Sequence, residues 1–258
     1  YDGCDLENNR FFAERLCRYG NMSGYDTQIV LSEELDPEDA PDIVVSRSRN
    51  LDVITTLEEY GSTVYNRSSV SRICNDKSAT YTFVQNLGIP CLDWSFGDIS
   101  PPGPPWIVKS CIGHGGKEVH KVDDVASAID LIQSMHDRKP IIQKMAGDAG
   151  KDLRVYVLGG RILASVMRSS DSDFRANFTL GGRAELHDVP DDAMSIIKKI
   201  VPELLPDFIG IDFVFDENGK AYLNEIEDVV GTRMLYELTD LDPARVYMEY
   251  ITHSKISL

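Results

Sequence analysis

Three acidic residues in the last quarter of the chain have the types and spacing of a cation site. Glu225 and Glu227 are two positions apart in a strand-like segment, and alternate residues of a strand share a face. Asp212 precedes the turn at 216–219 by about the distance at which Glu225 follows it. Carboxylates gathered on one face repel one another unless a hard cation lies between them, and Mg²⁺ or Mn²⁺ prefers such oxygen ligands. The alternative is a solvated acidic face, which Asp228 would extend.

A glycine-rich stretch offers a second kind of chemistry, the binding of phosphate. Gly113, Gly115 and Gly116 lie between Lys109 and Lys117. Glycine lets the backbone approach an anion closely, and the lysines supply positive charge. The spacing matches neither a P-loop nor the dinucleotide-binding fingerprint. A mobile surface hairpin is the competing interpretation of this stretch.

A third group of residues could neutralise the charge of a polyphosphate. Arg154 lies in an apolar strand pattern and Arg168 ends the partner strand of a predicted hairpin, so both could project toward one cleft. Guanidinium groups there would stabilise charge that develops during phosphoryl transfer. Each residue alone is more typical of a surface position, and only the combination suggests a site. The other members are Lys151, Asp152, Arg175, Asn177 and the pair Gly181-Gly182.

These residues need a scaffold, and the hydrophobic pattern predicts mixed helices and strands. In the first 65 residues helical and strand patterns alternate, which favours a small parallel α/β layer. No strand precedes the first helix, which leaves room for one in residues before Tyr1. The predicted helices are 8–19 and 52–60, and the predicted strands are 27–31, 42–46 and 63–65.

The rest of the chain is predicted to form hairpins and helices. A helix over 76–87 ends at Gly88, with Pro90 beyond it, as helices often do. Gly159-Gly160 and Asn218-Gly219 are typical of tight turns between antiparallel strands. The other predicted helices are 123–136, 191–204 and 243–251, and the predicted strands are 106–109, 118–122, 140–145, 153–158, 161–167, 209–215 and 221–226.

Composition excludes several functional classes. The 258 residues include 42 acidic and 26 basic side chains, which gives a formal charge of −16. Nucleic acids and anionic membranes require clustered Lys and Arg, and no apolar run approaches the roughly 20 residues of a membrane span. No secretory signal is visible, and five scattered cysteines without a C-x-x-C pair fit a reducing compartment. We expect a cytoplasmic protein with no nucleic-acid or membrane partner.

The order of these motifs resembles the ATP-grasp superfamily, and within it the RimK-like carboxylate–amine ligases, from about Ser71 to Gly231. Asn75-Asp76-Lys77 opens a helix similar to the family's lysine-bearing helix, and 141–146 (IIQKMA) resembles its hinge strand. The remaining motifs are D-L-R-V at 152–155, Arg168, F-R-A-N at 174–177, G-G at 181–182, G-I-D at 210–212 and N-E-I-E at 224–227.

The resemblance implies an α/β and α+β protein with an ATP-grasp fold. Two α+β subdomains would clasp ATP, preceded by a small parallel α/β N-terminal domain. The expected boundaries are 1–70 for the N-terminal domain and 71–258 for the ATP-grasp domain. Within the latter, 71–143 would be the central subdomain and 144–258 the C-terminal subdomain.

The resemblance also implies roles for individual residues. ATP would be bound by backbone groups around Lys144 and Ala146 in the hinge, next to Gln143, and by Asp152 near the ribose. Mg²⁺, or Mn²⁺, would be held by Asp212, Glu225 and Glu227. The triphosphate would contact Lys77, Lys109, Gly115 and Gly116, and the reacting groups would contact Arg154, Arg168 and Asn177.

The implied reaction joins a carboxylate to an amine. The carboxylate would attack the γ-phosphate to give an acylphosphate, and the amine would displace phosphate. The third metal position is usually Asn but is Glu227 here, and the usual Pro-Gly segment is replaced by 228–231 (DVVG). A non-catalytic ATP-binding interaction module and a D-alanine–D-alanine ligase-like enzyme are the alternatives. Small-molecule or peptide substrates and a homo-oligomer are also compatible with the resemblance.

Overall fold

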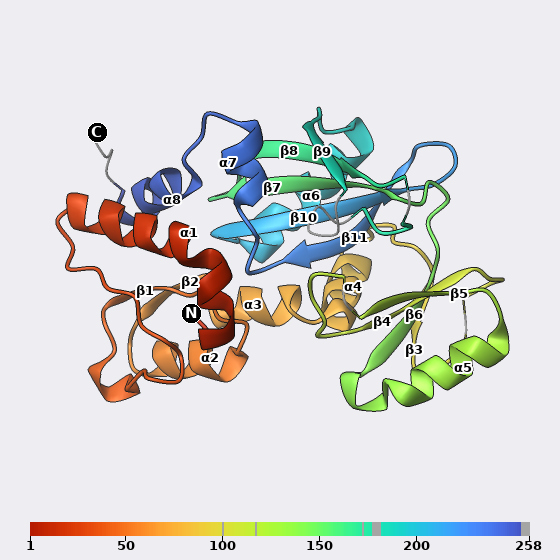
Figure 1. The fold of residues 1–258 in the computed structure, drawn as a ribbon, viewed down its shortest axis with the longest axis horizontal. Coiled ribbons are helices and arrows are strands. Elements are labelled where there is room, and N and C mark those ends of the chain that lie inside the picture. The colour runs from red at the N-terminus through yellow and green to blue at the C-terminus, as the bar shows by residue number, and fades with distance from the viewer. Residues whose placement is uncertain (100, 117, 172, 177–181, 254–258) are drawn as a thin grey trace.

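The N-terminal part of the chain forms a small parallel layer beside a long helix (Figure 1). The computed structural model describes residues 1–99, 101–116, 118–171, 173–176 and 182–253. Strands β1 and β2 pair in parallel, as the alternating pattern predicts. The elements are α1 (Gly3–Met22), η1 (Pro37–Asp39), β1 (Ile43–Val45), α2 (Leu51–Glu59), β2 (Thr63–Tyr65) and α3 (Ser68–Cys74).

The strand predicted over 27–31 is wrong. This segment is not in a strand, and the Val30 carbonyl instead accepts from the Tyr1 amino group at 3.1 Å. The β-branched residues of this segment match a strand pattern, but no strand in the described part of the chain pairs with it. Helix α3 was not predicted, because its serines and single arginine do not give an amphipathic pattern.

A four-stranded sheet, in the order β3-β6-β4-β5, forms the next body and is antiparallel throughout. Helix α4 precedes it and begins where the Asp76 carboxylate accepts from the Ser78 and Ala79 amides. Helix α5 covers one sheet face around Trp106, Val108 and Ile142. The elements are α4 (Lys77–Asn86), β3 (Trp94–Phe96), β4 (Trp106–Ser110), β5 (Val119–Val122), α5 (Val125–Ser134), η2 (His136–Arg138) and β6 (Pro140–Lys144).

A five-stranded antiparallel sheet, in the order β11-β10-β7-β8-β9, carries most of the remaining chain (Figure 1). Both turns predicted from Gly159-Gly160 and Asn218-Gly219 join neighbouring strands of it. Strand β9 and helix α7 were not predicted. The elements are β7 (Lys151–Leu158), β8 (Arg161–Ser169), β9 (Arg183–Leu186), α6 (Asp191–Leu204), β10 (Phe208–Phe215), β11 (Ala221–Glu227), α7 (Arg233–Leu238) and α8 (Pro243–Thr252).

The two faces of the large sheet have different partners. Leu153, Val155 and Val157 alternate onto the face that packs against α6, α3 and α4. Tyr156 and Leu158 lie on the other face, against α1, α7 and α8. Because Arg154 shares a face with Tyr156, the alternation that builds the second core also places Arg154 on that side of the sheet. One end of this face is thus apolar and the other is polar.

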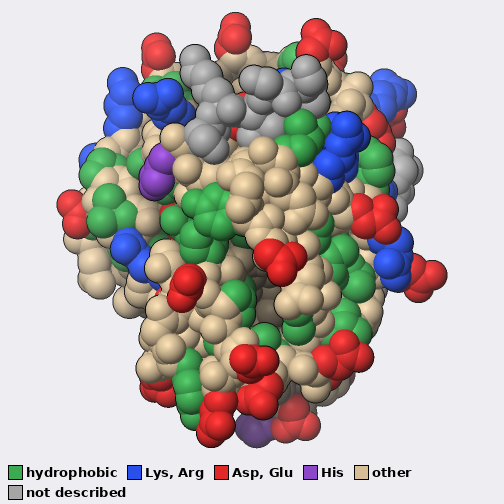
Figure 2. Space-filling view, turned by 90° about the vertical axis from the view of Figure 1, so that its left-hand side faces the viewer, with side chains coloured by type: hydrophobic (Ala, Val, Ile, Leu, Met, Phe, Trp, Pro, Cys, Tyr) green, Lys and Arg blue, Asp and Glu red, His purple; other side chains and the backbone are tan. Residues whose placement is uncertain are grey.

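The surface is strongly acidic around the N-terminal layer. Red side chains gather along the lower part of the face in Figure 2, where this layer lies. Exposed members near η1 are Glu33, Glu34, Asp36, Glu38, Asp39 and Asp42. Such a surface repels polyanions. None of the helices in the described ranges is long and apolar enough to cross a membrane.

Candidate active site

The strand register of the large sheet places opposite charges side by side. Asp212 on β10 lies directly opposite Arg154 on β7 and Glu225 on β11. Arg168 on β8 lies opposite Asp152 on β7 in the same way. Cross-strand neighbours are close enough for their side chains to interact. The register alone therefore explains why residues far apart in the sequence meet here.

A β-bulge in β11 places one more side chain, that of Asn224, beside these charged residues. The register shifts between Asp212 and Phe213, so that Glu225 and Leu223 have partners on β10 while Asn224 has none. A bulge disturbs strict alternation, and both Asn224 and Glu225 line the cleft. Alternation in the sequence cannot predict this, because it assigns neighbouring residues to opposite faces.

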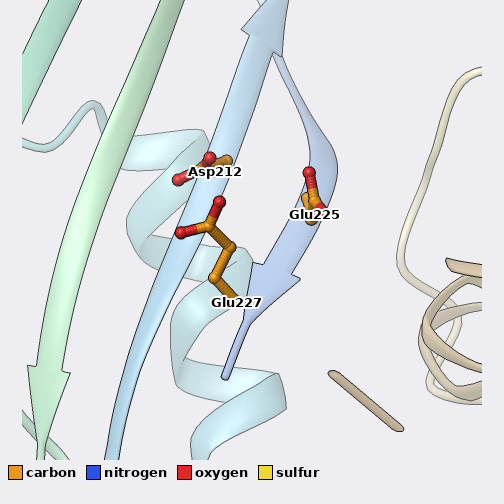
Figure 3. A group of neighbouring side chains, drawn as sticks. All are labelled: Asp212, Glu225 and Glu227. Atoms are coloured by element: carbon orange, nitrogen blue, oxygen red, sulfur yellow. The ribbon is translucent and has the colours of Figure 1, made fainter. Parts of the chain in front are cut away.

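The three predicted metal ligands come together. Asp212, Glu225 and Glu227 each offer an oxygen within 4.8 Å of the others (Figure 3). Asp212 is buried, whereas the side chains of Glu225 and Glu227 are 21% and 22% exposed toward the cleft. An all-carboxylate set of this kind fits a hard divalent cation. The chemistry and geometry of these residues therefore suit Mg²⁺.

Two arginines bind the same carboxylates. Arg154 donates through Nε and Nη2 to Asp212 at 2.8 and 2.6 Å, and through Nη2 to Glu227 at 2.8 Å. Arg168 donates through Nη2 to Asp212 at 2.8 Å and to Asp152 at 2.7 Å. Burial alone would raise the pKa of Asp212, but the two guanidinium groups outweigh it and lower that pKa to about 2. Asp212 is therefore ionised throughout the physiological range.

Two lysines complete the charge balance from the other side of the cleft. Lys77 Nζ lies 2.8 Å from Glu225 Oε1 and donates to the Gly113 carbonyl at 2.5 Å. Lys109 Nζ donates to Tyr81 Oη at 2.8 Å and to Asn224 Oδ1 at 3.0 Å. Burial, with a further contribution from Lys77, lowers the pKa of Lys109 to about 7. An anion at this position would favour the charged form.

These groups line one cleft between the two sheets. Asn177 lies outside the described residues. The roles assigned to the residues in the cleft stay predictions. The cleft brings together Lys77, Lys109, Gly115, Gly116, Gln143, Lys144, Ala146, Asp152, Arg154, Arg168, Asp212, Glu225 and Glu227.

Hydrogen bonds within the protein limit which backbone amides of the hinge strand could bind a base. The Lys144 amide donates to the Asp93 carbonyl at 2.8 Å and the Met145 amide to the Pro105 carbonyl at 3.2 Å, so neither is available to a ligand. Ala146 therefore becomes the stronger candidate for a backbone donor to adenine. Gln143 is 2% exposed and lines the cleft, and its buried Nε2 has no hydrogen-bond partner among the described residues. A buried orphan donor of this kind fits a polar ligand.

Tyr81 and Asn224 support the site but were not selected from the sequence, whereas Arg175 was named there with the charge-neutralising group. Tyr81 supports Lys109 and also donates to the Asn224 carbonyl at 2.7 Å. Arg175 donates to the Gly116 carbonyl at 2.9 Å and thereby connects the segment after β8 to the glycine-rich stretch. The signals for Arg175 and Asn224 were their positions inside the F-R-A-N and N-E-I-E motifs. Tyr81 gave no signal, because it lies in an ordinary helical pattern.

Cys111 lies next to the glycine-rich stretch in the sequence. Its side chain is buried, and burial raises the pKa of the thiol. A thiol held in its neutral form is a poor nucleophile.

The arrangement of the two sheets is that of the ATP-grasp fold. The solved structure of ATP-grasp ligase PsnB, complexed with a phosphomimetic variant of its minimal precursor, Mg and ADP, has a TM-score of 0.68 at 14% identity and covers 92% of each chain. The model of the RimK-like ATP-grasp domain matches residues 99–251. The chain belongs to this family and is an ATP-dependent ligase.

Two curated relatives extend the comparison. N-acetylaspartylglutamate synthase A of Homo sapiens is 28% identical over 232 residues, which covers 81% of this chain and 59% of that protein. Glutamate–LysW ligase ArgX of Sulfurisphaera tokodaii is 27% identical over 222 residues, which covers 80% of this chain and 79% of that protein.

Proposed function

We propose that this enzyme joins a carboxylate to an amine through an acylphosphate, with release of ADP and phosphate. The observation that carries the proposal is the convergence of the three carboxylates with two arginines and two lysines in a single cleft. Phosphoryl transfer needs charge neutralisation and alignment rather than a covalent nucleophile. This cleft supplies both.

The positions of the groups support a role for each of them. Asp212, Glu225 and Glu227 would hold Mg²⁺, which neutralises phosphate charge when bound. Lys77 and Lys109 would contact the triphosphate beneath Gly115 and Gly116. The extra negative charge of Glu227, relative to the usual Asn, is offset by its ion pair with Arg154.

In the first step an oxygen of the substrate carboxylate forms a bond to the γ-phosphorus and ADP leaves. Arg154 and Arg168 would stabilise the charge of the transferred group. In the second step the amine nitrogen forms a bond to the acyl carbon, phosphate leaves and the nitrogen loses a proton.

We propose that residues 1–70 form an N-terminal α/β domain that precedes the ATP-grasp domain of 71–258. A cytoplasmic location and a homo-oligomer stay predictions.

The test is ADP release with ATP, Mg²⁺ and pairs of carboxylates and amines. Both curated relatives have glutamate in their names, so glutamate is the first substrate to include. We expect ADP release that requires both partners, and transfer of one ¹⁸O atom from labelled carboxylate to phosphate. Release without label transfer would contradict the acylphosphate. Nucleotide binding without any substrate-dependent release would favour the non-catalytic module.

A further inference from the structure

The segment that follows β11, the strand of Glu225 and Glu227, is buried although it belongs to no strand. Strand β11 ends at Glu227, opposite Gly210 on β10. The next three residues, Asp228, Val229 and Val230, are 4%, 8% and 0% exposed. Contacts outside the sheet ladder must therefore fix the backbone on the C-terminal side of Glu227.

The N-terminal layer supplies several of those contacts. Asp228 Oδ1 accepts from Asn66 Nδ2 at 3.0 Å, and Asp228 Oδ2 accepts from the Ser71 hydroxyl. Arg49 Nη2 donates to the Val229 carbonyl at 3.3 Å, and Arg47 Nη2 donates to the Val230 carbonyl at 2.7 Å. These donors lie between residues 47 and 71, more than 150 positions before their acceptors.

The Asn66 side chain forms hydrogen bonds beside both strands that carry the proposed metal ligands, β10 and β11. Its Oδ1 accepts from the Asp207 and Phe208 amides at 2.6 and 3.2 Å, and its Nδ2 donates to the Phe208 carbonyl at 2.8 Å. Phe208 begins β10, the strand of Asp212, while Asp228 directly follows Glu227. One buried amide therefore links the start of one strand to the end of the other.

A close approach limits the freedom of this segment further. A Cβ added to Gly210 would lie 2.8 Å from a methyl group of Val230 and 3.6 Å from Arg154 Nε. The small residue lets Val230 lie against β10 beside the arginine that pairs with Glu227. A shift of the segment would therefore move both Glu227 and its partner.

We propose that Asp228, held by Asn66 and Ser71, is a positioning residue that sets Glu227 in place for the cation, so that the N-terminal layer is part of the metal site. The inference rests on the proposed function, because it takes Glu227 as a ligand. A carboxylate ligand must be held to within a fraction of an ångström to be preorganised. Asp228 is the anchor nearest to Glu227 in the chain.

The test measures metal and nucleotide binding separately. Mn²⁺ binding in the presence of ADP is followed by the loss of the free Mn²⁺ EPR signal, and ADP binding in EDTA is measured by calorimetry. We expect Asp228→Ala to weaken Mn²⁺ binding about tenfold, as losses of outer-shell partners do, with ADP binding in EDTA unchanged. Asp228→Asn keeps an acceptor for Asn66 and should stay within about twofold of the wild type.

Asp192→Ala is the matched control. Asp192 Oδ2 accepts from the Ala221 amide at 2.6 Å, so this variant loosens β11 at its other end. We expect it to leave Mn²⁺ binding unchanged. Equal weakening by Asp192→Ala and Asp228→Ala would show general damage to the strand and would overturn the proposal.

Ser71→Ala removes only the hydroxyl and serves if Asp228→Ala fails to fold. It should weaken Mn²⁺ binding without affecting ADP binding in EDTA, and wild-type Mn²⁺ affinity in the variant would overturn the proposal. If the wild type itself binds no Mn²⁺ with ADP, the proposed metal site fails and this inference fails with it. Wild-type binding that Asp228→Ala leaves intact overturns the inference alone.

Discussion

At the scale of single residues, the site is a set of mutually paired charges. Arg154 holds Asp212 and Glu227, while Lys77 holds Glu225. Buried charges without partners would cost several kcal/mol each, so these pairs keep the site assembled before any ligand arrives. A bound cation would pair with the carboxylates, and a bound polyphosphate would pair with the arginines and lysines. The total charge of the cleft would therefore stay nearly balanced.

The low pKa of Lys109 predicts a proton uptake on nucleotide binding. With a pKa of about 7, Lys109 is mostly neutral at pH 8, and a nearby phosphate raises its pKa. ADP binding should therefore take up most of one proton at pH 8 and little at pH 6. The affinity for ADP should decrease as the pH rises above 7. Calorimetry in buffers of different ionisation enthalpy measures this.

Lys109→Met should abolish the uptake, and Lys121→Met, at a surface ion pair with Asp123, should leave it unchanged. An equal uptake in Lys109→Met and the wild type would show that another group titrates.

At the scale of elements, sequence patterns predicted most of the scaffold but not its irregularities. Helix 191–204 and the strand at 63–65 have the predicted bounds, because strong periodicity and clear turn residues define them. The strand predicted over 27–31 failed, because a ladder partner cannot be read from one segment. The bulge at Asn224 was equally invisible, since it depends on the register between β10 and β11.

The contact between Arg175 and the glycine-rich stretch predicts a change in mobility. Arg175 donates to the Gly116 carbonyl at 2.9 Å, and its partly exposed side chain suggests a contribution of about 1 kcal/mol. Arg175→Ala should therefore speed amide hydrogen exchange around residues 113–116 about fivefold, as mass spectrometry of peptides can show. Arg183→Ala, which breaks an exposed ion pair with Asp171, should not. Equal exchange in both variants would contradict the role of Arg175.

At the scale of the whole molecule, the first helix, α1, is in contact with the last helix, α8. Helices α1 and α8 lie side by side in Figure 1, and Arg15 and Tyr19 on α1 both donate to the Asp242 carboxylate. Asp242 also caps α8 by accepting from the Ala244 and Arg245 amides. Sequence analysis placed α8 correctly but could not predict this long-range contact.

Asp242→Ala should lower the free energy of unfolding by about 2 kcal/mol, from the lost cap and a partly buried ion pair. Burial would raise the pKa of Asp242, but its hydrogen bonds to Arg15 and Tyr19 lower it below 3.8. The ionic part of this contribution is therefore complete above about pH 5 and declines in more acidic solution. Urea unfolding at pH 7 and pH 3 measures it, with the exposed Asp240→Ala as control. A loss below 0.5 kcal/mol at pH 7 would contradict this account.

The central claim is that three carboxylates form a magnesium–nucleotide site, and calorimetry of ADP binding with and without Mg²⁺ tests it most directly. We predict that Mg²⁺ tightens binding to the wild type at least about tenfold, that Glu225→Gln reduces this gain below about twofold, and that the exposed control Glu237→Gln keeps it. Binding that is equally tight without Mg²⁺, or a full gain in Glu225→Gln, would contradict the account.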